Sequence, residues 1–162
     1  MSRLFRKILV PHDFSKEATK ALRIAAELAA GARGRLIVVH AIPNVYPVAG
    51  LPPMAVGWYP PPFAPAELVA TERRRLETLV ARTLRGRGRP RAACRVVTGD
   101  PYQCIINAAR GATAIVMSTL GRTGLPHLLL GSVAEKVVRH APIPVLTIRP
   151  RALRKASARR RR

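Results

Sequence analysis

The sequence lacks long apolar runs, and it has few cysteines and few acidic residues. Two cysteines are too few for a disulfide framework, and Cys94 and Cys104 have no neighbours with metal-ligand spacing. We therefore expect both thiols to be reduced and structural, with redox chemistry as the alternative. No apolar run approaches the roughly 18 residues that cross a bilayer, so we expect a cytoplasmic protein with no membrane contact. A Walker lysine motif and a GxGxxG motif are also absent, which argues against a P-loop NTPase and a dehydrogenase.

The shortage of acids leaves the chain strongly basic. Eight Asp and Glu residues stand against 29 Lys and Arg residues, so the formal net charge is +21. Most arginines are scattered, as on a solvated surface, and the sequence contains no zinc-finger, RRM or helix-turn-helix signature. The exception is the tail at 151–162, which carries seven positive charges and no acid. We expect this tail to be disordered, and its composition fits either a solvated segment or one that contacts a polyanion such as RNA or DNA.

Apolar runs alternate with amphipathic segments along residues 1–150. Nearly continuous apolar runs predict buried strands, whereas apolar residues three or four positions apart predict helices. The predicted strands are 6–10, 36–41, 92–98, 114–117 and 145–148, and the predicted helices are 16–31, 66–84, 101–110 and 131–141. Ser15 and Asp100 are expected to cap the helices that follow them. This alternation predicts a single α/β domain with a doubly wound, Rossmann-like parallel sheet and helices on both faces.

Residues 42–65 interrupt the alternation. They contain eight of the fifteen prolines and four of the seven aromatic residues. A connection of this length is uncommon inside a compact domain. We expect a loop insert whose aromatic side chains pack on the domain or on a second subunit, and the alternative is a lid or docking loop.

Two loops at the carboxyl ends of predicted strands carry residues suited to a nucleotide. Residues 118–132 follow a strand, contain glycines and lead into a helix, whose first N–H groups have no partner within the helix and lie at the positive end of its dipole. Asp13, after the first strand, can accept hydrogen bonds from ribose hydroxyls or merely cap the next helix. In a doubly wound sheet, ligands bind at this edge, where the chain order reverses. The sequence therefore predicts a nucleotide site there.

The glycine-containing segment resembles the ATP-binding branch of the universal stress protein family. The family signature is Gly, two residues, Gly, nine residues, and then Gly followed by Ser or Thr. Gly121, residues 122–130 and the pair Gly131-Ser132 match it, whereas Ser118 stands at the first glycine. The resemblance covers nearly the whole predicted domain.

The resemblance implies an ATP-binding domain with five parallel strands in the order 3-2-1-4-5. It also implies a homodimer in which the last strand, Val145 to Ile148, pairs with its counterpart in a second subunit. Carried over residue by residue, adenine would contact Ala41, ribose would contact Asp13, and the phosphates would contact Gly121, Gly131 and Ser132. The other implied lining residues are Pro11, His12, Met117, Ser118, Leu120, Val133 and Ala134. Mg²⁺ or Mn²⁺ would accompany the triphosphate, with no side-chain metal cluster.

Two of these positions depart from the family pattern. If the position of Ser118 needs a positive φ, serine costs on the order of 1 kcal/mol there; if it needs only a small residue, the hydroxyl can add a hydrogen bond to phosphate. Leu120 stands where many relatives have histidine, which removes a polar group beside the phosphates.

The leading hypothesis is a stress-response dimer that is regulated by ATP occupancy. Catalysis is secondary, because Asp13 is the only carboxylate near the predicted site and a hydrolase needs a positioned base or a metal cluster. At most we expect a slow ATPase. The alternative hypothesis is a dimeric scaffold that does not bind nucleotide and contacts nucleic acid or acidic partners through the tail.

Overall fold

The structure, a computed structural model, describes residues 3–43, 66–86, 88–120 and 131–149. The tail at 151–162 lies outside the described residues, and so does the predicted loop insert except for Ile42 and Pro43. Ile42 is the last residue of a strand, so the sheet extends one residue further than the sequence predicts.

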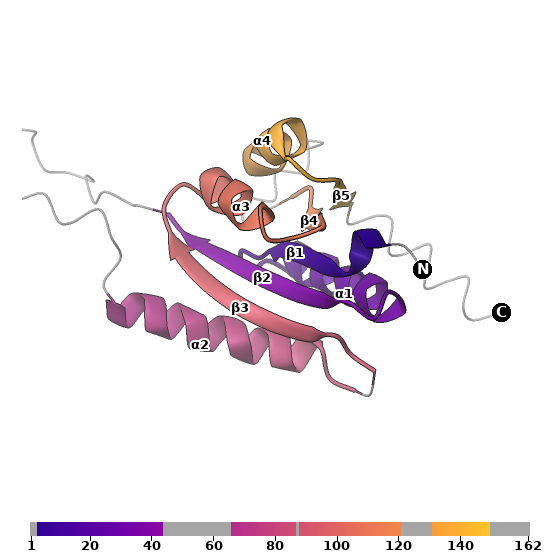
Figure 1. The fold of residues 1–162 in the computed structure, drawn as a ribbon. Coiled ribbons are helices and arrows are strands. Elements are labelled where there is room, and N and C mark those ends of the chain that lie inside the picture. Colours follow the sequence, from indigo (N-terminus) through magenta and orange to yellow (C-terminus); the bar gives the residue numbers. More distant parts are fainter. Residues whose placement is uncertain (1–2, 44–65, 87, 121–130, 150–162) are drawn as a thin grey trace, which may run out of the picture.

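The described residues form a five-stranded parallel sheet (Figure 1). Its strands are β1 (Lys7–Pro11), β2 (Arg35–Ile42), β3 (Arg91–Thr98), β4 (Ala114–Ser118) and β5 (Val145–Ile148). They lie in the order β3-β2-β1-β4-β5, so the predicted fold class and strand order are confirmed. Chain order reverses between β1 and β4, because β2 and β3 extend the sheet on one side of β1 and β4 and β5 extend it on the other.

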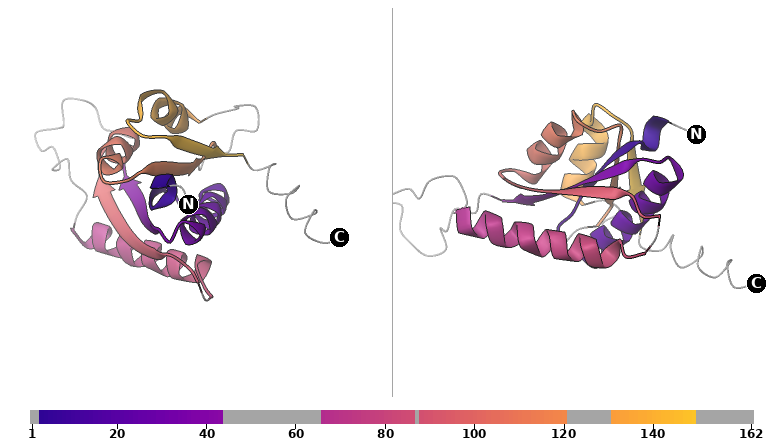
Figure 2. Two further views of the ribbon diagram at one scale, coloured as in Figure 1. Left: turned by 45° about the vertical axis from the view of Figure 1, so that its right-hand side comes forward. Right: turned by 60° about the horizontal axis from the view of Figure 1, so that its bottom comes forward.

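Four α-helices of the described residues cover the two faces of the sheet (Figure 2). They are α1 (Lys16–Gly31), α2 (Ala66–Thr83), α3 (Pro101–Ala109) and α4 (Ser132–His140), and a short 3-10 helix, η1 (Arg3–Phe5), precedes β1. Helices α1 and α2 pack on the face that presents Ile8, Leu36 and Val116, and α3 and α4 pack on the face that presents Leu9 and Ile37. Successive residues of a strand point to opposite faces, so nearly continuous apolar runs fill both cores. None of the described helices is both long and apolar enough to cross a membrane.

The helix starts differ in a way that matters for the site. Ser15 caps α1, since its Oγ accepts a hydrogen bond from the Ala18 N–H at 3.0 Å. Asp100 caps α3 in the same way, with 3.0 Å between its Oδ1 and the Gln103 nitrogen. Both predicted caps are confirmed. The residue before α4 is Gly131, and no side chain among the described residues caps that helix.

Candidate functional site

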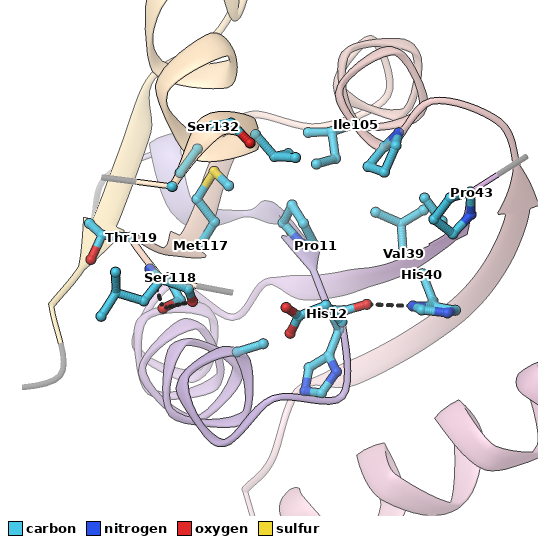
Figure 3. A pocket seen from close by; sticks show the side chains of 18 residues that line it. Pro11, His12, Val39, His40, Pro43, Ile105, Met117, Ser118, Thr119 and Ser132 are labelled. Carbon is cyan, nitrogen blue, oxygen red and sulfur yellow. Dashed lines mark hydrogen bonds between the residues drawn. The ribbon is translucent and has the colours of Figure 1, made fainter. Parts of the chain in front are cut away.

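A cavity of about 340 Å³ lies at the carboxyl edge of the sheet, between the ends of β1, β2 and β4 (Figure 3). Eleven of the twelve site residues named from the sequence line it, and the twelfth, Gly121, lies outside the described residues. The residues that sequence reasoning missed are Ala18, Val39, His40, Pro43, Pro101, Ile105 and Thr119. Five of these seven residues are apolar, and they lie on β2, directly after β2, or in the first two turns of α1 and α3, positions that carry no motif of their own. The cavity lies at the reversal of chain order, where ligands of doubly wound sheets bind.

The loop between β1 and α1 places a carboxylate in the cavity wall. Asp13 accepts a hydrogen bond from the Ser15 N–H at 3.0 Å through Oδ1. Because Ser15 itself caps α1, the alternative in which Asp13 serves as the helix cap is wrong. Oδ2 has no described hydrogen-bond partner, so it remains able to accept from a ligand.

His12 is buried with both ring nitrogens in use. Its Nδ1 accepts from the Phe14 N–H at 3.0 Å, and its Nε2 lies 3.3 Å from Thr19 Oγ1, which donates to the Ser15 carbonyl at 2.9 Å. This chain of bonds requires the proton on Nε2. Burial lowers the pKa of His12 to about 4, although the charge of Asp13 opposes the shift. His12 is therefore neutral and fully bonded near pH 7, which fits a structural residue better than a general base.

His40 connects the Asp13 loop to β2 and α2. Its Nδ1 donates to the His12 carbonyl oxygen at 2.7 Å, the dashed line on the right of Figure 3. Its ring lies 4.5 Å from the ring of Phe14, and the guanidinium of Arg75 lies 4.1 Å from the centroid of the same phenyl ring. Phe14 has a φ of 65°, a conformation that side chains rarely adopt. The surrounding contacts hold it there, and with it the loop that carries Asp13.

The opposite wall of the cavity is apolar. It is formed by Val39 and Ala41 of β2, by Pro43 directly after this strand, and by Ile105 of α3. Ala41 is half-buried, and its small side chain leaves room beside the strand end. A wall of this kind suits a flat apolar group such as a purine base.

Ser118 ends β4 with its hydroxyl engaged in the loop. Its Oγ donates to the Leu120 carbonyl at 2.8 Å and accepts from the Leu120 N–H at 3.2 Å. Among the described non-glycine residues only Phe14 and Arg33 have positive φ. Serine is therefore unstrained at this position. Its proton is directed to the protein, so the expected extra hydrogen bond to phosphate would require this turn to open.

We expect Ser118→Gly to lower the free energy of unfolding by about 1–2 kcal/mol, through loss of these two hydrogen bonds and greater freedom of the unfolded chain. Urea denaturation of wild type, Ser118→Gly and Ser118→Ala would measure the two causes separately. Equal stability of the glycine variant and wild type would contradict the turn seen here.

The start of α4 presents backbone donors to the cavity. Gly131 lines the cavity, and its N–H donates to the Thr119 carbonyl at 2.7 Å. Ser132, Val133 and Ala134 also line it and form the first turn of α4, where N–H groups have no partner within the helix. A Cβ on Gly131 would lie 3.3 Å from the Thr119 oxygen, so the two loops approach closely here. Among the described residues, no three His, Cys, Asp or Glu side chains group as a metal site.

The sheet topology and this cavity define a doubly wound α/β protein with a ligand-sized pocket at its switch point. The model of the universal stress protein family matches residues 4–149, and the chain belongs to that family. A universal stress protein of Thermus aquaticus, "in QAH/OAS sulfhydrylase 3'region", is 34% identical over 148 residues, which cover 90% of this chain and all of the relative.

Solved structures of the family share the fold. A universal stress protein from Archaeoglobus fulgidus in complex with dAMP superposes with a TM-score of 0.60 at 22% identity, covering 90% of this chain and 98% of that one. Another universal stress protein, in complex with cAMP, gives a TM-score of 0.58 at 21% identity, covering 89% and 96%. Some structural relatives therefore bind adenine nucleotides.

Proposed function

We propose that this protein binds ATP in the cavity and acts as a nucleotide-dependent regulatory dimer of the ATP-binding branch. The observation that carries the proposal is the uncapped start of α4 in the wall of a cavity that also holds the Asp13 carboxylate. Helices α1 and α3, by contrast, are each capped at the N-terminus by a side chain. Phosphate would take the place of that cap at α4.

The three parts of ATP match three parts of the cavity wall. The base would lie against Ala41 and its apolar neighbours, the ribose hydroxyls would donate to Asp13, and the phosphates would accept from the first turn of α4. Gly121 belongs to the proposed phosphate contacts by its match to the signature. Mg²⁺ or Mn²⁺ would be held by phosphate oxygens and water, the usual coordination of Mg²⁺ on nucleotides.

Binding rather than hydrolysis is the proposed activity. Asp13 is the only acid among the described residues that line the cavity, and it is assigned to ribose. The ring of His12 is already fully hydrogen-bonded. No described group is therefore placed as a general base.

The proposed dimer would form through β5. This strand is an edge of the sheet and pairs only with β4 among the described strands. Leu146 on β5 is 39% exposed, and Val138 on the adjacent α4 is 47% exposed. Pairing two copies of β5 would satisfy the free strand edge and cover apolar side chains of this kind.

Calorimetry with Mg-ATP on nuclease-treated protein tests the binding proposal. We expect wild type to bind with a dissociation constant on the order of 1 μM, and Asp13→Asn to bind about tenfold more weakly, because a charged acceptor for ribose is lost. Asparagine keeps an oxygen that can accept from the Ser15 N–H, so the loop is preserved. An ATP analogue without ribose hydroxyls is the control, since it should bind both proteins equally. Absence of heat with wild type at high ATP would overturn the proposal.

A further inference from the structure

All the lysine and arginine side chains on the five strands lie on one face of the sheet. They are Lys7 on β1, Arg35 on β2, and Arg91 and Arg95 on β3. Each is an even number of residues from Leu9, Ile37 or Val97, which pack under α3 and α4. Because side chains alternate along a strand, the four cations point to the α3 and α4 side. We call these four residues the basic face.

The sheet register brings three of these cations into one row. Lys7 is paired with Arg35, and Arg35 is paired with Arg91, on three neighbouring parallel strands. Arg35, Arg91 and Arg95 are exposed, and so is Ala93 between the last two. The helices of this side therefore leave the outer part of the sheet open, at the edge opposite β5 in Figure 1.

No acid neutralises the basic face. The chain has eight acids, all within the described residues, and none lies on a strand. The described ion pairs join Glu17 to Lys20, Glu72 to Arg75, Glu77 to Arg73, and Glu135 to Arg139, and Glu72 also lies 4.0 Å from His40 Nε2. Like charges on neighbouring strands repel one another, so the row is unfavourable until an anion lies against it.

We propose that the basic face binds the phosphate backbone of a double-stranded nucleic acid. Two strand spacings of the row span about 10 Å, the axial length of about three base pairs of B-form DNA. Arginine donors match phosphate oxygens in a fixed fork geometry.

The side chains between the cations favour a duplex over other anions. The outward residues of β3 are Arg91, Ala93, Arg95 and Val97, with no aromatic ring. Single-stranded nucleic acid is held largely by bases stacked on aromatic rings, which this face lacks. An acidic protein would need an apolar centre to its interface, and exposed Ala93 alone provides little. A duplex offers dense charge without either requirement.

This site is separate from the nucleotide cavity and from the proposed dimer edge. The row of Lys7, Arg35 and Arg91 consists of the first residues of three parallel strands, whereas the cavity lies at their carboxyl ends. Strand β3 and strand β5 are opposite edges of the sheet. The basic face therefore stays open when either of the other sites is occupied.

The test measures binding of the full chain to a short mixed-sequence duplex DNA by fluorescence anisotropy over a series of KCl concentrations. We expect the triple variant Arg35→Gln, Arg91→Gln, Arg95→Gln to bind at least about tenfold more weakly at 0.1 M salt. Its slope of log affinity against log salt should be shallower by about 2.7, or 0.9 for each lost phosphate contact. Replacing the same three arginines with lysine should retain the slope.

The matched control removes three exposed arginines of α1 and α2, on the other side of the sheet, as Arg23→Gln, Arg74→Gln, Arg82→Gln. It has the same net charge as the first triple variant, and it should keep most of the wild-type slope. Equal losses in both triple variants would overturn the proposal in favour of general charge attraction. If the basic-face variant lost affinity for single-stranded DNA or for polyglutamate but not for the duplex, the proposal would be overturned in favour of that single strand or acidic polypeptide.

Discussion

Replacing Gly131 with aspartate is expected to lower the affinity for Mg-ATP by more than about 100-fold, equivalent to about 2.7 kcal/mol. The new carboxylate would stand immediately before the first turn of α4, where the proposed phosphates lie. It would repel them electrostatically and would accept the same backbone N–H groups. Calorimetry of the variant beside wild type measures the loss.

The fold should survive this change, because aspartate is a favourable N-cap and its charge lies at the positive end of the helix dipole. The thermal midpoint of the variant is therefore expected to match wild type within a few degrees. Gly131→Ala is the steric control, since it adds only the Cβ that approaches the Thr119 oxygen to 3.3 Å. ATP binding by the aspartate variant at wild-type affinity would show that the phosphates do not lie at α4.

The fold follows from patterns that a single sequence displays directly. The buried runs at Ile8 to Val10 and Leu36 to Val39 can be buried on both faces only in a sheet covered by helices on each side, which is where the structure places them. The strand order came from the family resemblance. The sequence also predicted where the cavity wall lies, because the residues that directly follow parallel strands meet at one edge of the sheet.

The contacts that hold the site could not be predicted in the same way. His40 lies in a continuous apolar run and therefore reads as a strand residue. Its bond to the His12 carbonyl depends on a turn in which Phe14 has positive φ, which no local pattern of this sequence indicates. Ser118 shows the same limit, because its hydroxyl binds a backbone two residues away and the motif suggests only a missing glycine.

The titration of the buried His12 leads to the largest expected effect on stability. His12 has a pKa near 6.5 in the unfolded chain and about 4 in the folded one, because burial penalises the charged ring. Above pH 6.5 both states hold it neutral, and its contribution to stability is fully present. As the pH falls from 6.5 to 4, the unfolded chain binds a proton that the folded chain excludes. We expect a loss of about 3 kcal/mol over this interval, with no further loss from His12 below it.

His12→Asn isolates this contribution from the titration of the carboxylates. Asparagine can place an oxygen near the position of Nδ1 and accept from the Phe14 N–H, but it does not titrate. Urea denaturation from pH 7 to pH 4 should show the stability of wild type falling more steeply than that of the variant, with the difference approaching 3 kcal/mol. A parallel pH dependence would mean that the folded protein accommodates the charged ring. We do not expect that outcome, because the Phe14 N–H donates to Nδ1 in the folded protein, and a protonated Nδ1 cannot accept this hydrogen bond. Protonation of His12 in the folded chain, near and below pH 4, would release the turn that carries Asp13. ATP affinity should therefore show no loss from His12 between pH 6.5 and 5, and should decline only as the pH approaches 4, less in the variant than in wild type.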